Sequence, residues 1–299
     1  MNQLKTLLLF GVLSAILVAI GSAFGSTWAW LMLGVALAIN LGAYFFSDRL
    51  VLAMHRARQI SAHDAPRLFA TVAELAARAE IPVPRLYLVD DPQPNAFATG
   101  RNPKNGAVAV TTGLLATLPE REQRGVLAHE IAHIANRDVL IATIAAGLAT
   151  AVSHLANLAT FAALFGGGGG QSDEDEEGSS PFGGLLFAFV APIAATLVQL
   201  AISRSREYEA DRRGALLTGD PEGLARALEH LEHGAHVVPG AAPASAASLY
   251  IVNPFAGVGG LVRLFSTHPL TAERVRRLRA MTAASAARPR ARARLVDAY

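Results

Sequence analysis

The sequence predicts an α-helical integral membrane protein with a polar, mainly helical α+β domain that carries a small sheet. Hydrophobic residues make up 52% of the chain, above the roughly 45–50% of a soluble domain. The excess lies in four uncharged stretches, each near the roughly 17–25 residues that a membrane helix needs. Between them, apolar positions at helical spacing and one alternating segment indicate the folded domain.

The uncharged stretches are expected to pair into two membrane hairpins, made by residues 7–24 with 28–46 and by residues 139–165 with 182–203. A cleaved signal peptide is the alternative for the first stretch, because Lys5 precedes it and Gly21 and Ser22 are typical of a cleavage site. The second stretch follows almost at once, which favours a hairpin that is kept.

Basic residues indicate the orientation of the hairpins. Lys and Arg flank the stretches on one side only, and residues 166–180, which join the third and fourth stretches, contain neither. Since Lys and Arg near span ends stay in the cytoplasm, both termini and the polar segments are predicted to be cytoplasmic. The glycine run and the acidic block at Asp173–Glu177 then form a solvated external loop, for which a calcium site is the less favoured interpretation.

This topology divides the chain into five parts. They are an N-terminal membrane hairpin (1–48), the first half of the polar domain (49–138), a second membrane hairpin (139–203) with an acidic external loop (166–181), the second half of the polar domain (204–284) and a basic tail (285–299).

The string HEIAH at His129–His133 is the clearest chemical signal. In a helix its two histidines lie on one face and can bind one cation, while Glu130 can polarise a water beside that cation. The chain has no cysteine, which excludes thiolate ligands and disulfides. Two incidental histidines on an ordinary amphipathic helix are the alternative. The spacing of Thr117 and Glu120 predicts a capping box at the start of this helix.

Glu207 is the predicted third ligand, because a catalytic zinc uses three protein ligands and one open position. His133 lies six residues before the third stretch, and Glu207 four residues after the fourth. In an antiparallel pair the two helices project about 9 and 6 Å beyond the hydrocarbon core of the bilayer, on the same side, which brings Glu207 near the histidines. The alternative for Glu207 is surface pairing with arginines. Asp211 shares its helical face and can accept the second N–H of a ligating imidazole, whereas Glu209 is expected to point away.

A second histidine cluster, formed by His230, His233 and His236, is interpreted as a partly exposed helix end. Steps of three residues drift off one helical face, and no acid stands in the HExxH register. A second metal site is therefore less favoured.

The chain resembles the HtpX family of membrane-bound zinc endopeptidases, bacterial relatives of the CAAX prenyl-protein endopeptidases. The strings that carry the resemblance are NAFATG at Asn95–Gly100, HEIAHIANRD at His129–Asp138, SREYEAD at Ser205–Asp211 and STHPLTAERVRRL at Ser266–Leu278.

The resemblance implies a gluzincin-type domain with one Zn²⁺ per chain, held by His129, His133 and Glu207. It further implies that Glu130 is the general base and that Asp211 matches the acid that follows the third ligand. His268, in the Thr-His-Pro string, is expected to hydrogen-bond the oxyanion of the transition state.

The alternation of Ala107, Val108, Ala109 and Val110 predicts a strand after a turn around Pro103–Asn105. An exposed edge there would hold substrate as an added strand, and a strand internal to a sheet is an equally supported alternative. The neighbouring residues Asn95, Ala96, Phe97 and Ala98 are expected to line the same cleft.

The resemblance also implies quality control in the bacterial inner membrane, by cleavage of cytoplasmic segments of damaged membrane proteins. Protein substrates and the bilayer are the expected partners, and the arginine-rich tail at Arg288–Arg294 is expected on anionic lipid rather than on nucleic acid. The alternatives are a prenyl-type processing protease and a non-enzymatic scaffold or transporter. Transport is disfavoured because the four stretches contain no Asp, Glu, Lys or Arg.

Overall fold

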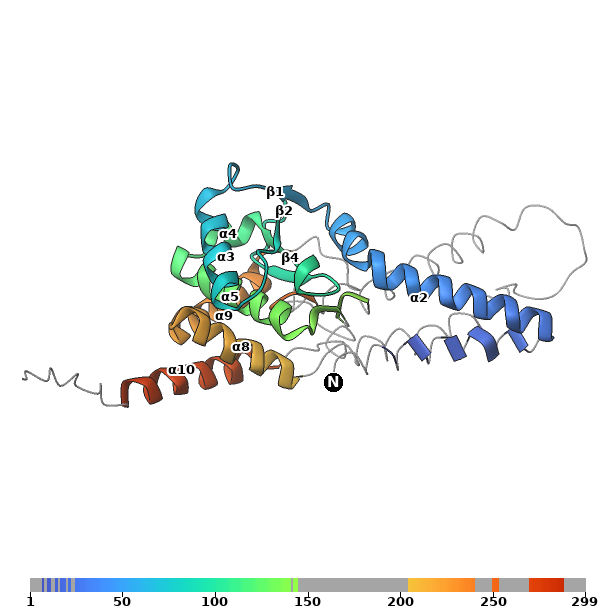
Figure 1. The fold of residues 1–299 in the computed structure, drawn as a ribbon. Coiled ribbons are helices and arrows are strands. Elements are labelled where there is room, and N and C mark those ends of the chain that lie inside the picture. Colours follow the sequence, from blue (N-terminus) through green and yellow to red (C-terminus); the bar gives the residue numbers. More distant parts are fainter. Residues whose placement is uncertain are drawn as a thin grey trace, which may run out of the picture.

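The structure, a computed structural model, describes residues 25–140, 142–144, 204–239, 249–252 and 269–287, with scattered positions between 7 and 22. Most of the third predicted membrane stretch, all of the fourth, the acidic loop and the basic tail from 288 onward lie outside the described residues. The described part consists of one long projecting helix and a compact body of helices around a sheet (Figure 1).

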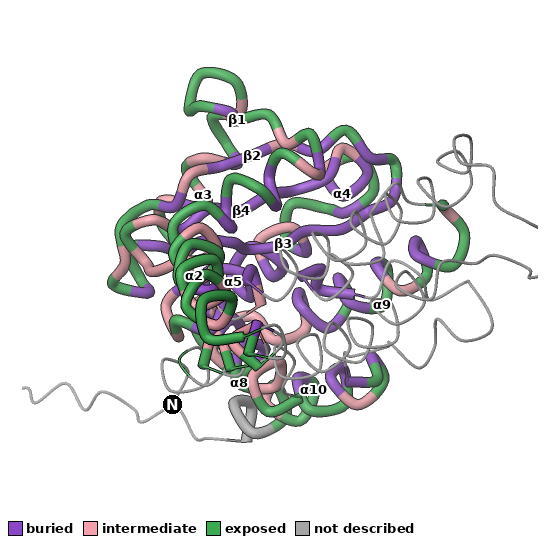
Figure 2. The backbone as a smooth tube through the Cα atoms, turned by 90° about the vertical axis from the view of Figure 1, so that its right-hand side faces the viewer, coloured by how far each residue is buried: buried purple, intermediate pink, exposed green. Residues whose placement is uncertain are grey.

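The projecting helix, α2 (Ser26–Met54), contains the whole of the second predicted stretch. Its most apolar 18-residue window has a mean hydropathy of 1.8 and is only 6% buried, and it is the one helix among the described residues that is long and apolar enough to cross a membrane. Figure 2 shows it exposed along most of its length. Near its end Asp48 is buried and accepts a hydrogen bond from Arg85 at 2.8 Å, which ties the helix to the sheet.

Four strands form a mixed sheet in the order β1-β2-β4-β3. Antiparallel pairing joins β1 (Arg58–Ile60) to β2 (Arg85–Val89) and β3 (Ala96–Thr99) to β4 (Ala107–Thr111), while β2 and β4 run parallel. The short helix η1 (Pro103–Asn105) makes the predicted turn before β4.

The predicted strand is therefore β4, and it is internal, so its interpretation as an exposed edge is wrong. Alanine and valine alternate along it, but both are apolar, so the strand suits burial on both faces. Val108 and Val110 belong to the core under the helices, whereas Ala107 and Ala109 face the end of α2. The outer side of β3, which carries the NAFATG string, is the sheet edge nearest the histidine helix.

Six helices complete the described body: α3 (Pro66–Arg78), α4 (Thr112–Thr117), α5 (Glu120–Asn136), α8 (Arg204–Thr218), α9 (Pro221–Val237) and α10 (Thr271–Ala287). Helix α5 is central, and α8, α9, α3 and β3 all pack against it. Its apolar side chains Leu127, Ile131 and Ile134 are fully buried. The most enclosed helix of the body is therefore the one that carries HEIAH.

The predicted capping box is wrong. Helix α5 begins at Glu120 after Pro119, without a side-chain cap. Thr117 is instead the last residue of α4, and its hydroxyl donates to the Gly113 carbonyl at 2.7 Å. The hydroxyl that the box requires is thus engaged inside the preceding helix.

Helices α5 and α8 approach closely at Gly214. A Cβ on this glycine would lie 3.0 Å from the backbone nitrogen of His129, which is a very tight contact. A side chain at position 214 would therefore push α8 away from the histidines.

We expect Gly214→Val to lower the free energy of unfolding by about 1–3 kcal/mol, as overpacking does, and to weaken metal binding because Glu207 moves with α8. Thermal unfolding and metal titration of the purified protein measure both effects. Leu216→Ala, at an exposed position of the same helix, is the control and should change stability by less than about 0.5 kcal/mol. A Gly214→Val protein as stable as wild type would contradict the packing argument.

Candidate active site

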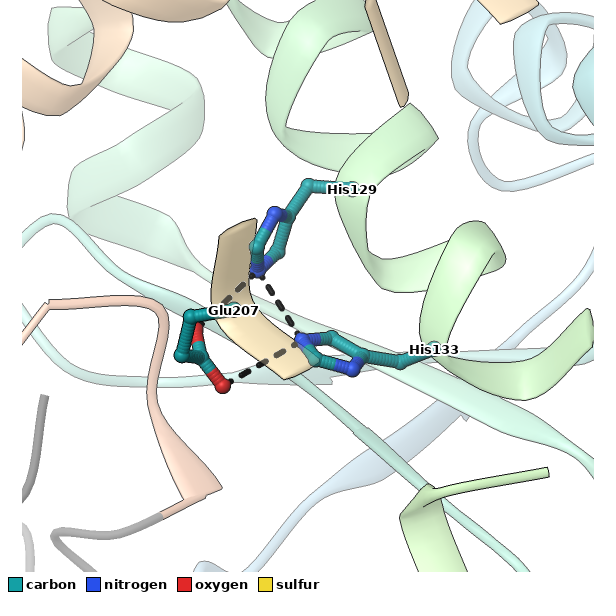
Figure 3. A group of neighbouring side chains, drawn as sticks. All are labelled: His129, His133 and Glu207. Atoms are coloured by element: carbon teal, nitrogen blue, oxygen red, sulfur yellow. Dashed lines mark hydrogen bonds and ion pairs between the residues drawn. The ribbon is translucent and has the colours of Figure 1, made fainter. Parts of the chain in front are cut away.

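Three side chains from two helices meet at one point in the structure (Figure 3). His129 and His133 come from successive turns of α5, and Glu207 comes from α8. The two Nε2 atoms lie 3.0 Å apart, and each is 3.6 Å from a carboxylate oxygen of Glu207. The structure thus brings Glu207 beside the histidines across 74 residues of sequence, as the spacing predicts.

The spacing of these atoms suits a tetrahedral metal ion. Zinc binds nitrogen and carboxylate oxygen at about 2.0–2.2 Å, so ligand atoms at two corners of the tetrahedron are roughly 3.3–3.5 Å apart. The separations of 3.0 and 3.6 Å bracket this value. Among the described residues no other group of His, Asp and Glu side chains converges in this way.

Each histidine is oriented by a carboxylate on its far side. His129 Nδ1 lies 2.9 Å from Asp211 of α8, and His133 Nδ1 lies 3.1 Å from Asp138. Since a carboxylate only accepts, both Nδ1 atoms carry the proton and both Nε2 atoms offer lone pairs to a cation. Asp138 reaches back because Arg137, at the end of α5, adopts a left-handed conformation with φ 57°.

The electrostatics of the cluster favour positive charge at its centre. Burial alone would lower the pKa of His133, but Asp138 and Glu207 outweigh burial and raise that pKa to about 10. The pKa of His129 is also raised despite burial, through Asp211 and Glu207. The carboxylates that raise the pKa of both imidazoles create a negative potential that would also attract a divalent cation, so the donor set fits a metal.

Glu130 lies on α5 between the two histidines and is 2% exposed. Burial raises the pKa of its carboxyl group. A general base is more effective when its pKa lies nearer the working pH. This burial and the raised pKa suit a group that transfers protons.

Arg274 of α10 is a site residue that sequence reasoning missed. Its side chain is 1% exposed and donates twice to Asp211, from Nε at 2.8 Å and from Nη2 at 2.7 Å. Burial opposes ionisation of Asp211, but Arg274 prevails and lowers the pKa of Asp211 to about 2. One sequence signal could have indicated its burial. Arg274 stands next to Val275 and four residues before Leu278, so it shares the apolar face of α10.

Asp138 was also missed, although it ends the HEIAHIANRD string. Glu209, in contrast, points away from the site as expected and pairs with Arg212 on the surface. The second histidine cluster is exposed on α9, and His230 lies 2.6 Å from a carboxylate oxygen of Glu122. This confirms the interpretation as a partly exposed helix end.

The remaining predicted site residues have two different outcomes. Asn95 and the strand residues Ala96, Phe97 and Ala98 are all buried beside α5, at the outer edge of the sheet. His268 lies outside the described residues, which resume at Pro269.

The sequence profile of peptidase family M48 matches residues 62–282. A protease HtpX homolog from Methylibium petroleiphilum is 49% identical over 284 residues, covering 94% of this chain and 98% of the relative. A second from Syntrophobacter fumaroxidans is 51% identical over 283 residues, covering 94% and 99%.

A similar fold occurs in the crystal structure of Ste24p from S. mikatae, with a TM-score of 0.51 and 21% identity. The likeness covers 93% of this chain and 65% of the length of Ste24p, and at this identity it concerns the fold alone. The family match and the relatives span the site described above. The chain therefore belongs to peptidase family M48, as a metalloprotease of the HtpX type.

Proposed function

We propose that the chain is a zinc endopeptidase of the bacterial inner membrane that cleaves cytoplasmic segments of damaged or misassembled membrane proteins. The observation that carries the proposal is the convergence of His129, His133 and Glu207, with Glu130 buried on α5 between the two histidines. The long apolar helix α2 joins the same body and supports a membrane location. Membership of a peptidase family removes the non-enzymatic scaffold as an alternative.

In the proposed site, His129, His133 and Glu207 would hold the ion, and zinc would supply the Lewis acidity that polarises a peptide carbonyl and acidifies water. Glu130 accepts a proton from the attacking water and delivers it to the leaving amine. Asp211 and Asp138 keep the imidazoles in the ligating tautomer. His268 is proposed to hydrogen-bond the oxyanion.

Contacts near α2 support the proposed membrane hairpins at 1–48 and 139–203. Asn40 donates to the Ser14 hydroxyl at 2.9 Å, so the first two predicted stretches touch. Ile144, early in the third stretch, packs against Phe10 and Ala43. Polar contacts between helices, like this one, help to hold membrane helices together. A first stretch that packs in this way fits a retained hairpin better than a cleaved signal peptide.

The proposed substrate site is the edge strand β3 with Asn95. A substrate that adds a strand to this edge is held through backbone hydrogen bonds, with little demand on its side chains. Such recognition suits a protease that acts on many unfolded segments. A prenyl-type processing protease would instead prefer prenylated peptides. Cleavage of a farnesylated peptide, measured beside the casein cleavage described below, distinguishes this alternative from the proposed broad protease.

Two substitutions test the assigned metal chemistry in detergent-purified protein. We expect Glu130→Gln to keep stoichiometric zinc and to reduce casein cleavage by about 10²–10⁴-fold, because the general base is lost. Glu207→Ala should weaken zinc binding by more than roughly 10–100-fold, which is the usual effect of losing a residue that only hydrogen-bonds a metal ligand. Metal analysis and cleavage rates measure both, and Glu209→Ala is the matched control on α8. Unchanged cleavage in both variants would remove the mechanism.

Arg274 provides a test of the buried charges behind the site. Arg274→Gln leaves Asp211 buried without its cation, and we expect a loss of about 3–5 kcal/mol in the free energy of unfolding. It should also weaken zinc binding, because Asp211 no longer orients His129. Arg279→Gln, on the same helix, removes surface ion pairs with Glu222 and Glu229 of α9, and should cost less than about 1 kcal/mol. Equal effects of the two variants would contradict this role.

The absence of cysteine makes the topology directly testable. We expect a cysteine introduced at Ser172 to react with a membrane-impermeant maleimide in intact spheroplasts, because the acidic loop is external in the proposed topology. A cysteine at Ala62, which is exposed on the folded body, should react only after lysis. The opposite pattern would reverse the proposed orientation.

A further inference from the structure

The outer edge of β3 is partly covered by a segment of the chain itself. Residues Leu249–Val252, here called the strap, run antiparallel to the strand, with Tyr250 opposite Phe97. The Ile251 N–H donates to the Ala96 carbonyl at 3.1 Å. The strap therefore uses a backbone acceptor that an added substrate strand would need.

Two side chains near the site donate hydrogen bonds to backbone carbonyls of the strap. Asn95 Nδ2 donates to the Val252 carbonyl at 3.0 Å, and Arg274 Nη1 donates to the Ile251 carbonyl at 2.7 Å. Nη2 of the same arginine lies 3.5 Å from ring nitrogens of His129. The strap thus lies beside the metal-binding histidines, and its backbone is bound as a peptide would be.

Tyr250 of the strap packs closely against two aromatic rings, but its hydroxyl is left without a hydrogen bond to the part of the chain that the structure describes. The ring of Tyr250 lies 5.3 Å from that of Phe97 and 5.5 Å from that of His55, which follows α2. The Tyr250 hydroxyl and His55 Nε2 are buried, yet neither has a hydrogen-bond partner among the described residues. Buried unpaired polar atoms destabilise an arrangement, so the strap is a replaceable occupant of this edge.

We propose that the strap is an internal stand-in for substrate, which blocks the edge of β3 until an extended peptide displaces it. This inference rests on the proposed function. The incoming peptide runs antiparallel to β3 and accepts the hydrogen bonds of Asn95 and Arg274 through two successive carbonyls. A large apolar or aromatic side chain takes the place of Tyr250 against Phe97 and His55, which gives the cleft its preference.

Ile251→Pro tests the block, because proline removes the N–H that bonds Ala96. We expect kcat/KM for an unfolded protein substrate to rise roughly two- to tenfold, the loss of one backbone hydrogen bond expressed as a ratio. Ile251→Ala keeps the N–H and is the matched control for the lost side chain. An unchanged or lower kcat/KM, in a protein with the Tm of the alanine control, overturns the proposal.

A reversible lock tests the same idea by binding. Opposed residues of an antiparallel pair have Cα atoms about 4.5–5.5 Å apart, which suits a disulfide, and the chain has no other cysteine. In Phe97→Cys/Tyr250→Cys protein that also carries Glu130→Gln, the cleft lacks the Phe97 ring, so the reduced state should bind a fluorescent casein peptide more weakly than Glu130→Gln protein does. We expect oxidation to weaken that remaining binding at least a further tenfold. Tyr250→Cys alone, treated with the same oxidant, is the control.

Equal binding in the two redox states, at any level, overturns the strap proposal even if Ile251→Pro does not fold. The proposed function fails separately, when wild-type protein with bound zinc cleaves no protein substrate and Glu130→Gln changes nothing.

Discussion

The contact between α5 and α8 determines the geometry of the metal centre. Each helix presents two polar side chains one turn apart, His129 with His133 on α5 and Glu207 with Asp211 on α8. The four face one another where α8 lies against α5, and at Gly214 this contact leaves no room for a side chain. A shift of α8 would separate ligands that belong to different halves of the sequence, and no local feature of either helix could compensate.

The same contact explains why so many charged groups can be buried together. An isolated ionised side chain in a protein interior is strongly unfavourable, but a hydrogen-bonded chain in which opposite charges are neighbours is tolerated. Arg274, Asp211 and His129 form such a chain, and each member is 3% exposed or less. Helix α10 thus contributes to the centre without providing a ligand, since it supplies the cation that keeps Asp211 ionised.

The parts of the site that follow from local spacing could be predicted from the sequence. HEIAH specifies one helical face, and the edges of the apolar stretches place Glu207 on the same side as His133. Arg274 could not be assigned in this way, because the burial of an arginine depends on where α10 packs. The alternation in β4 predicts a strand but not its neighbours, since strand order depends on pairing between distant segments. The capping box failed because Thr117 belongs to a separate short helix, α4.

The joint between α2 and the sheet has a consequence for which bonds can be cut. Only residues 55–57 separate α2 from β1, and the Asp48–Arg85 pair clamps the end of the helix against β2. If α2 spans the bilayer as proposed, this stiff joint sets the height of the catalytic centre above the lipid. A membrane-embedded substrate would then be cut only where its chain has come loose for long enough to reach that height, and a tightly folded neighbour would be left intact.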